Sequence, residues 1–355
     1  MRLSPGQAAP WFSAPTPTNP TFAFSSVAGR YVLVACLPHD EDGRKAALAA
    51  MAAHQSLFDE THLLAFAVIR DQESISRAKD RRGIRWFLDA DGEVSRLFGA
   101  LGPDGAERPL WVILDPTLRV LALGEMGDTA RVFSILRSLP HPNDHAGVPI
   151  HAPVLIVPRV FEPALCRRLI DFYEAEGGVR SGVMREVDGK TVGVLDSFKS
   201  RRDAHVRDDA FQAELRNRIQ VRLLRQITNA FQFEATRIER YVVACYDAQE
   251  GGYFRPHRDN TTAGTAHRKF ACSINLNAEE FEGGDLRFPE FGSQTYRPPT
   301  GGAVVFSCSL LHEATPVTRG RRYAFLPFFY DQAGADVREQ NLHKLVLPET
   351  EPAES

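Results

Sequence analysis

The sequence predicts a two-domain α+β protein: an α/β domain followed by a barrel or jelly roll of short strands with supporting helices. The chain has 355 residues, which favours two domains over one. The segment 138–153 contains four prolines, at 140, 142, 149 and 153, and almost no apolar periodicity, which is typical of a linker. Before them strands alternate with helices, and after them short strands follow one another. We therefore predict domains at 1–139 and 154–331, a linker at 140–153 and a C-terminal tail at 332–355, frayed from Pro348 onward.

In the first domain, apolar runs of strand length alternate with helical segments. The run at 31–37 (YVLVACL) contains no charged residue, which is typical of a buried strand. The Ala-rich segment 42–58 has no glycine or proline after Gly43 and predicts a helix. A hairpin around Pro116 and a helix at 129–139 complete a mixed sheet with helices on both faces. The remaining elements expected are strands at 63–69, 84–88, 110–114 and 119–123 and a helix at 72–79.

The second domain begins with helices and continues as strands. A strand at 154–158 and a helix at 163–176 come first. A second helix at 209–230 carries an apolar stripe at every fourth position from Phe211 to Ile227, which predicts its buried face, and its arginines are expected on the solvated face. Glycine pairs then separate strands expected at 238–246, 253–256, 270–277, 285–288, 303–306, 313–317 and 323–330.

Composition narrows the class of protein. Forty-two basic and 45 acidic residues give a net charge of −3, which argues against a dedicated nucleic-acid binder because such proteins usually carry a basic surface. The five cysteines show no CxxC spacing and are expected to be buried free thiols. No apolar run reaches the length of a membrane span, and the N-terminus lacks the order of a signal peptide. We expect a soluble cytoplasmic protein without a membrane partner.

Three residues form a candidate metal site. His257 and Asp259 lie at i and i+2, so on a strand their side chains would share one face. His312 follows the apolar strand expected at 303–306 and the segment 307–311, roughly fifty residues later. Two imidazoles and one carboxylate would leave coordination positions open, as non-haem Fe(II) oxygenases require. Zn²⁺ could be held by the same three residues.

Arg322 is the second candidate. It opens the apolar strand expected at 323–330, beside the strand that begins after His312. Its guanidinium could bind both oxygens of a carboxylate within a dry barrel. Arg321 and Arg319 are alternatives, but strand alternation lets only one of Arg321 and Arg322 point inward. A metal site together with an arginine that binds a carboxylate suggests 2-oxoglutarate as a cosubstrate, because its keto acid end would chelate the metal and its distal carboxylate would meet the arginine.

These motifs resemble a known family. The stretches ACYDAQEGGYFRPHRDN, FACSINLNAEEFEGGDLRF and GGAVVFSCSLLHEATPVTRGRRYAFLPFFYD are similar to the catalytic domain of Fe(II)/2-oxoglutarate dioxygenases of the prolyl 4-hydroxylase type. The resemblance implies a double-stranded β-helix and Fe(II), 2-oxoglutarate, O2 and optionally ascorbate as cofactors. It implies iron ligation by His257, Asp259 and His312, with Arg322 on the distal carboxylate and Tyr246 near the cosubstrate.

One position departs from that pattern. Asn275 stands where some relatives have a tyrosine that helps to hold 2-oxoglutarate. Other polar residues are expected to have structural or surface roles: His205 on the surface, His267 in a loop, and Arg255 and Arg258 in solvent opposite Asp259.

The first domain resembles a peroxiredoxin-type thioredoxin fold through LSPGQAAPWF, GRYVLVACLP, WFLDADGEVSRLFG and PLWVILDPTLRVLA. The family's reactive cysteine would follow the first core strand at the start of a helix, where a helix N-terminus lowers its pKa. This sequence has PHDEDGRK there, and Cys36 lies several residues too early. We therefore expect a non-catalytic domain that docks or presents a substrate.

The residues together predict a 2-oxoglutarate-dependent dioxygenase that hydroxylates a C–H bond, such as a protein prolyl residue, and releases succinate and CO2. A zinc hydrolase with the same His/Asp/His set, an inactive interaction protein, and a redox enzyme working through Cys36 are the alternatives. The substrate is expected to be a protein, a peptide or a small molecule.

Overall fold

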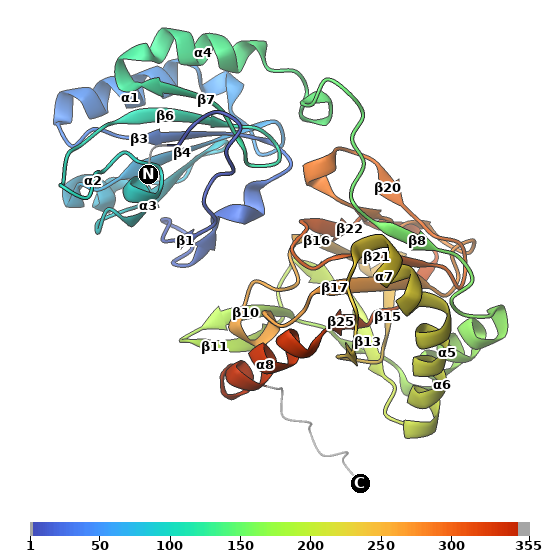
Figure 1. Cartoon of the computed structure of the whole chain (residues 1–355). Coiled ribbons are helices and arrows are strands. Elements are labelled where there is room, and N and C mark those ends of the chain that lie inside the picture. The colour runs from blue at the N-terminus through green and yellow to red at the C-terminus, as the bar shows by residue number, and fades with distance from the viewer. Residues whose placement is uncertain (1–2, 347–355) are drawn as a thin grey trace. The chain divides into compact units, whose positions relative to one another are not determined.

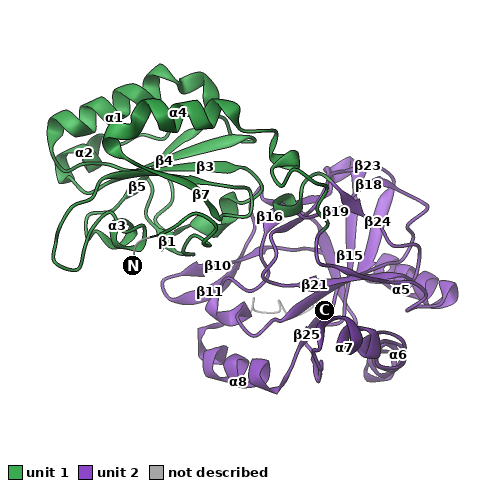
Figure 2. Cartoon of the chain, turned by 45° about the horizontal axis from the view of Figure 1, so that its top comes forward, with its two compact units in different colours: residues 1–151, 289–293 green, residues 152–288, 294–355 purple. Residues whose placement is uncertain are grey.

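The computed structural model describes residues 3–346 and divides into two compact units. Unit 1 comprises 1–151 with 289–293, and unit 2 comprises 152–288 with 294–355 (Figure 2). Figure 1 follows the chain from the blue first unit into the strand-rich second unit. The last residues of the expected frayed tail, 347–355, lie outside the described residues.

Unit 1 is built on one five-stranded mixed sheet in the order β5-β4-β3-β6-β7. β3, β4 and β5 run parallel, whereas β6 and β7 form an antiparallel hairpin added to β3. The parallel strands are almost wholly apolar because both faces of the sheet are covered. The strands are β3 (Tyr31–Cys36), β4 (Leu63–Ile69), β5 (Ile84–Leu88), β6 (Leu110–Leu114) and β7 (Val120–Glu125).

The two faces of this sheet have different covers. α1 (Glu41–Ala53) and α4 (Thr129–Ser138) pack their apolar residues, among them Met51 and Phe133, on one face. The other face meets a cluster of phenylalanines that includes Phe24, Phe66 and Phe87. Two short helices, α2 (Gln72–Arg77) and α3 (Glu93–Leu97), follow β4 and β5. A small pair, β1 (Ser13–Ala14) and β2 (Phe22–Ala23), precedes the sheet.

Unit 2 contains a large sheet and a smaller sheet. The large one has the order β14-β25-β17-β24-β15-β13-β9, with β21 pairing β17 and β8. The smaller one has the order β12-β16-β22-β19-β20. The strands of the large sheet are β8 (Leu155–Val157), β9 (Val179–Arg180), β13 (Arg202–His205), β14 (Arg237–Ile238), β15 (Val242–Asp247), β17 (Phe270–Asn275), β21 (Ala303–Ser307), β24 (Arg321–Phe325) and β25 (Phe328–Tyr330). Those of the smaller sheet are β12 (Lys199–Ser200), β16 (Tyr253–His257), β19 (Leu286–Arg287), β20 (Thr295–Tyr296) and β22 (His312–Ala314).

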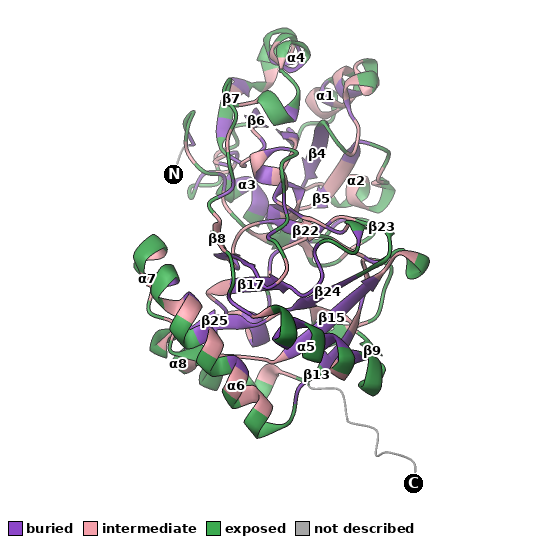
Figure 3. Cartoon of the chain, turned by 90° about the vertical axis from the view of Figure 1, so that its right-hand side faces the viewer, coloured by how far each residue is buried: buried purple, intermediate pink, exposed green. Residues whose placement is uncertain are grey.

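Helices cover the large sheet on one side. α5 (Pro163–Glu176), α6 (Asp209–Ile219) and α7 (Arg225–Phe231) bury an apolar stripe against the strands, as the purple stripes on otherwise green and pink helices show (Figure 3). Leu215, Leu223 and Ile227 of this stripe are fully buried beside Phe325. Two further pairings, β10 (Val183–Val187) with β11 (Lys190–Val194) and β18 (Glu282–Gly283) with β23 (Val317–Arg319), extend from the sheets.

Three sequence predictions about these elements are wrong in detail. The single helix expected at 209–230 is interrupted by a π-helical turn at Gln220–Leu224, although its apolar stripe stays buried. The strand expected at 323–330 is two strands, β24 and β25, because Pro327 between them cannot donate to the ladder. The expected tail begins with a helix, α8 (Gln332–Asn341), which Asp331 caps by accepting from the Gly334 amide.

Candidate active site

Three potential metal ligands converge in unit 2. β16 ends at His257, β22 begins at His312, and the two histidines are directly paired in the antiparallel register. Asp259 follows in the turn after β16, and its carboxylate oxygens lie 3.6 Å from His257 Nε2 and 3.3 Å from His312 Nε2. Among residues 3–346, these three form the one group whose His, Cys, Asp and Glu ligand atoms could hold a metal ion.

Backbone carbonyls set the orientation of both imidazoles. His257 Nδ1 lies 2.8 Å from the Arg255 carbonyl oxygen, and His312 Nδ1 lies 3.0 Å from the Leu310 carbonyl oxygen. A carbonyl can only accept, so each Nδ1 donates to its carbonyl, and each Nε2 faces Asp259, where it can donate a proton or bind a metal ion. A neutral ring with its proton on Nδ1 is the tautomer that a metal ligand at Nε2 needs.

The charges of the three residues also suit a cation. Burial, together with the neighbouring His312, lowers the pKa of His257 to about 4, so this ring is neutral at neutral pH. Burial alone would raise the pKa of Asp259, but His312 and His257 beside it hold that pKa well below its usual range. Neutral imidazole and ionised carboxylate are the forms that bind divalent iron, and three protein ligands leave room for others.

Aromatic rings wall the cluster. The Phe254 ring stacks on His257 with 3.4 Å between centroids, and the Phe306 ring centroid lies 4.6 Å from that of His312. Phe288 stands 6.1 Å from His312 on another side. The ligands therefore lie in apolar surroundings, where electrostatic interactions with a bound ion are strong.

Arg322 is held on the inner side of β24. Its side chain is buried, with the residue 3% exposed, and Nη2 donates to Ser273 Oγ at 2.8 Å. Nε lies 3.4 Å from Asn275 Oδ1, and the guanidinium carbon lies 5.1 Å from the Tyr246 ring centroid. Burial lowers the pKa of Arg322, but an arginine stays charged in a protein.

This buried cation has no carboxylate partner in the described part of the chain, which is costly unless an anion completes the site. Arg321, the adjacent residue, instead reaches solvent and pairs with Asp247 at 2.8 Å. Arg319 is also exposed and pairs with Glu282. Of the three arginines, Arg322 alone points into the unit.

Tyr246 lies opposite Arg322 in the β15–β24 register and is buried. Its hydroxyl accepts from Arg201 Nη1 at 3.4 Å, and Arg201 Nη2 donates to Asp203 at 2.6 Å. The Arg201–Asp203 pair was not among the residues predicted from the sequence. The available signal was the alternation Lys199, Arg201, Asp203, which places three charged side chains on one face of an extended segment.

A second unpredicted group supports Asp259 from behind. Arg268 Nη1 donates to the Asp259 carbonyl oxygen at 3.3 Å. Glu239 accepts from Arg268 Nε and Nη2, both at 2.6 Å, and lies 3.0 Å from His267 Nε2. His267 lies in a turn between η7 (Ala263–Thr265) and β17, so its expected place in a loop is confirmed, and there it is a buried partner of Glu239. Nothing in the spacing of these residues links 239 to 268.

Two other expectations have different outcomes. Arg258 is buried and donates to the Ser309 carbonyl, so its expected position in solvent is wrong. The reason is that β16 ends at His257, after which strand alternation no longer orients the side chains. Arg255 and His205 are exposed as expected.

The thiols are inert in their surroundings. All five cysteines are free and buried. Burial, and Asp89 nearby, raises the pKa of Cys36 far above its ordinary value. After β3, Asp40 caps α1 by accepting from the Gly43 amide at 2.7 Å, at the place where the first domain's relatives would carry a reactive cysteine. Unit 1 thus has no reactive thiol among its described residues.

Comparison with known proteins finds similar families for both parts of the chain. Residues 241–330 match the 2OG-Fe(II) oxygenase superfamily, and residues 5–122 match the AhpC/TSA family. A PKHD-type hydroxylase of Cupriavidus metallidurans is 34% identical over 115 residues, which cover 30% of this chain and 50% of the relative. A PKHD-type hydroxylase of Paracoccus denitrificans is 29% identical over 191 residues, covering 47% of this chain and 81% of the relative.

Prolyl hydroxylases are among the solved structures that resemble the chain. A prolyl-4-hydroxylase of Pseudomonas putida has 20% identity and a TM-score of 0.38, covering 53% of this chain and 95% of its own. A prolyl hydroxylase of Trichoplax adhaerens, in complex with a hypoxia inducible factor peptide fragment, has 14% identity and a TM-score of 0.41, covering 61% and 97%.

The chain spans only part of the length of several relatives. The chain spans half the length of the Cupriavidus relative and 41% of the length of a PKHD-type hydroxylase of a Synechococcus species. Within residues 3–346, no helix combines the length and apolar character needed to cross a membrane. The matches confirm both family resemblances: residues 5–122 are similar to the AhpC/TSA family, and residues 241–330 are similar to the 2OG-Fe(II) oxygenase superfamily.

Proposed function

We propose that this protein is an Fe(II)- and 2-oxoglutarate-dependent dioxygenase that hydroxylates a C–H bond. The observation that carries the proposal is the combination of the His257, Asp259 and His312 cluster with the buried Arg322, which has no carboxylate partner among the described residues. Bound Fe(II), 2-oxoglutarate and O2 would supply the oxidising chemistry, with succinate and CO2 as by-products.

Each residue has a distinct role in this proposal. His257, Asp259 and His312 would hold the metal through two Nε2 atoms and a carboxylate. Arg322 would bind the distal carboxylate of 2-oxoglutarate, beside the hydroxyl of Ser273 that already accepts from it. Tyr246 would line the cosubstrate with its ring, and Asn275 would hold Arg322 Nε rather than contact the cosubstrate. The phenylalanines around the ligands would exclude water.

We also propose the finer organisation of the chain. The catalytic domain spans 154–331 and has a double-stranded β-helix formed by the two sheets of unit 2. The domain at 1–139 is non-catalytic, with 140–153 as the linker. Its one cysteine, Cys36, is buried and has a raised pKa, so we propose that the domain docks or presents a substrate rather than acting through a thiol. Five unpaired thiols suit a reducing compartment, and we propose a cytoplasmic location.

The PKHD-type hydroxylases among the relatives support hydroxylation as the reaction. For the substrate we propose a prolyl residue of a protein or peptide, as the sequence resemblance to prolyl 4-hydroxylases implies. Ascorbate is proposed as an optional reductant. The other functions that the sequence allows have no contact in their favour. A zinc hydrolase would leave buried Arg322 without a role, and an inactive protein would have no use for three convergent ligands.

The experiment that tests the proposal is anaerobic reconstitution with Fe(II), followed by measurement of succinate after addition of 2-oxoglutarate and O2. Wild-type protein should bind one iron per chain and form succinate, and His312→Ala should lose both. His205→Ala, which removes an exposed histidine of unit 2, is the matched control and should retain both. Iron binding that His312→Ala leaves unchanged would falsify the proposed site.

A further inference from the structure

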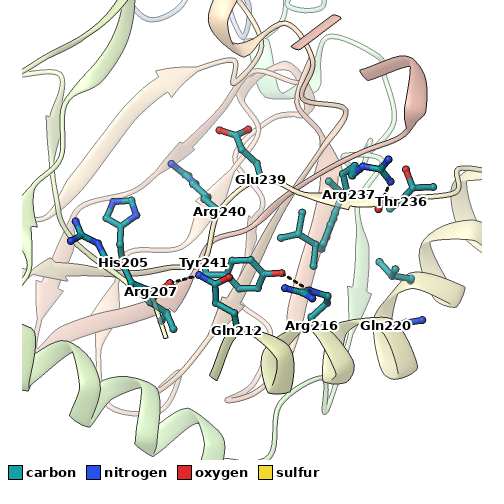
Figure 4. A pocket seen from close by; sticks show the side chains of 15 residues that line it. His205, Arg207, Gln212, Arg216, Gln220, Thr236, Arg237, Glu239, Arg240 and Tyr241 are labelled. Atoms are coloured by element: carbon teal, nitrogen blue, oxygen red, sulfur yellow. Dashed lines mark hydrogen bonds between the residues drawn. The ribbon is translucent and has the colours of Figure 1, made fainter. Parts of the chain in front are cut away.

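A groove on unit 2 carries positive charge that no part of the mechanism uses. It has a volume of about 1110 Å³ and is bounded by residues 205–207, by residues 235–241 and by one row of the α6–α7 helix. Figure 4 shows Gln212 and Arg216 of that row extending toward Tyr241, with Arg216 Nε donating to the Tyr241 hydroxyl at 3.1 Å. We call it the arginine groove.

The charges that line the arginine groove are unbalanced. Arg207, Arg216, Arg237 and Arg240 all line it, against a single carboxylate, that of Glu239. That carboxylate is already bound by Arg268, which does not line the groove. None of the four arginines forms an ion pair with a carboxylate anywhere in residues 3–346. The arginine groove therefore attracts an anionic partner.

The free edge of β14 and the apolar residues that line the groove favour a polypeptide as the bound partner. β14, which carries Arg237, is the terminal strand of the large sheet and pairs only with β25 among the described strands. An edge strand can add an extended chain through main-chain hydrogen bonds. Val206, Ile238 and Phe329 give the lining an apolar component that alternate side chains of such a strand could contact. A nucleic-acid strand would use the charges but not this edge.

The wall of the groove is connected to the candidate metal site. Glu239 binds Arg268, and Arg268 donates to the carbonyl of Asp259. Arg240 and Arg268 also lie on the Phe328 ring, with their guanidinium carbons 4.3 Å and 4.1 Å from its centroid. A partner in the groove would thus lie one residue layer from a proposed ligand.

We propose that the arginine groove binds an extended acidic segment of the protein substrate, outside the residue that is hydroxylated. This inference rests on the proposed function, because it assumes that the partner bound in the groove is the substrate of the proposed dioxygenase. The binding step itself needs neither iron nor turnover, so it can be tested separately.

The test is fluorescence anisotropy of a labelled ten-residue peptide that alternates Glu and Val, titrated with the metal-free full chain. The peptide should bind, and Arg207→Glu with Arg216→Glu should weaken binding roughly tenfold or more, since two attractive charges become repulsive. A rise in salt from low to high concentration should weaken wild-type binding as well. Arg225→Glu, which reverses an exposed arginine of the same helix outside the groove, is the matched control and should bind like wild type.

Three results would overturn the inference: no binding of the Glu-Val peptide, equal binding of the double variant and wild type, or preference for a single-stranded oligonucleotide of the same length. Circular dichroism of the double variant and its succinate formation from 2-oxoglutarate report whether the fold and the active site are intact. Loss of peptide binding with both preserved supports the groove. Failure of succinate formation in every protein, wild type included, would contradict the proposed function and leave the peptide result standing.

Discussion

Replacing Glu239 with glutamine should destabilise unit 2 and leave unit 1 unchanged. The Glu239 and Arg268 side chains are 14% and 10% exposed, and Glu239 accepts two hydrogen bonds of 2.6 Å from Arg268. Glutamine keeps the shape but removes the charge, which leaves Arg268 buried without its counter-ion. Removing one partner of a buried pair costs about 3–5 kcal/mol, and we take about 3 kcal/mol because glutamine can still accept one hydrogen bond.

The distribution of tryptophan and tyrosine allows the unfolding of each unit to be followed separately. All three tryptophans, at 11, 86 and 111, lie in unit 1, whereas seven of the eight tyrosines lie in unit 2. In urea, tryptophan fluorescence therefore follows unit 1, and the near-UV circular dichroism of tyrosine follows mainly unit 2. With a urea dependence of about 2 kcal/mol per molar, the unit 2 midpoint should fall by about 1.5 M.

The pH dependence has a defined sign. Burial alone would raise the pKa of Glu239, but Arg268 and His267 hold it well below its ordinary value. A depressed folded-state pKa stabilises the fold above the unfolded pKa of about 4.3, and this stabilisation is lost as pH falls below it. The difference between wild type and Glu239→Gln should therefore be constant above about pH 5 and shrink in acid.

The control is Glu282→Gln, which removes the carboxylate of an exposed pair with Arg319 and should leave both transitions in place. The reasoning about Glu239 is refuted if Glu239→Gln unfolds at the wild-type urea concentration in the tyrosine signal. It is equally refuted if the tryptophan transition shifts by the same amount, because the loss would then not belong to unit 2.

The other predictions concern the core, the thiols and the metal. Phe133→Ala, whose buried ring lies 5.7 Å from Trp111, should lower the stability of unit 1 by about 3–5 kcal/mol and shift only the tryptophan transition. Iodoacetamide should add to none of the five buried thiols of the native protein and to all five in urea, counted by mass spectrometry, and activity should survive the native treatment. A chelator should abolish succinate formation, and Fe(II) but not the redox-inert Zn²⁺ should restore it; restoration by Zn²⁺ would contradict an iron-dependent oxidation.

The sequence was most informative where chemistry and periodicity agree. Alternation along a strand was enough to predict that Arg322 and Arg321 point in opposite directions, which the structure bears out. The i, i+2 spacing of His257 and Asp259, with His312 on a later strand, led to the three residues that the structure brings together. Apolar runs gave most strands of unit 1, because a sheet covered on both faces needs uninterrupted apolar strands.

Contacts between residues far apart in the sequence, and the points where strands end, could not be predicted from local sequence patterns. Glu239 and Arg268 meet only through folding of the large sheet, and no local pattern pairs them. Arg258 was misplaced because strand alternation was extended past the end of β16, which only hydrogen bonding defines. The hairpin strands β10 (VMREV) and β11 (KTVGV) mix valines with charged residues and a glycine, so neither contains the uninterrupted apolar run that reveals a buried strand.

We propose that 2-oxoglutarate binds both to the metal held by the three ligands and to the guanidinium of Arg322. Anaerobic calorimetric titration of 2-oxoglutarate into Fe(II)-loaded protein tests it most directly. We predict one molecule bound per chain, with affinity roughly a hundredfold weaker in Arg322→Met, since a desolvated charge-assisted contact is lost. Binding should weaken strongly without metal as well. Affinity that neither the removal of iron nor Arg322→Met changes would contradict the account.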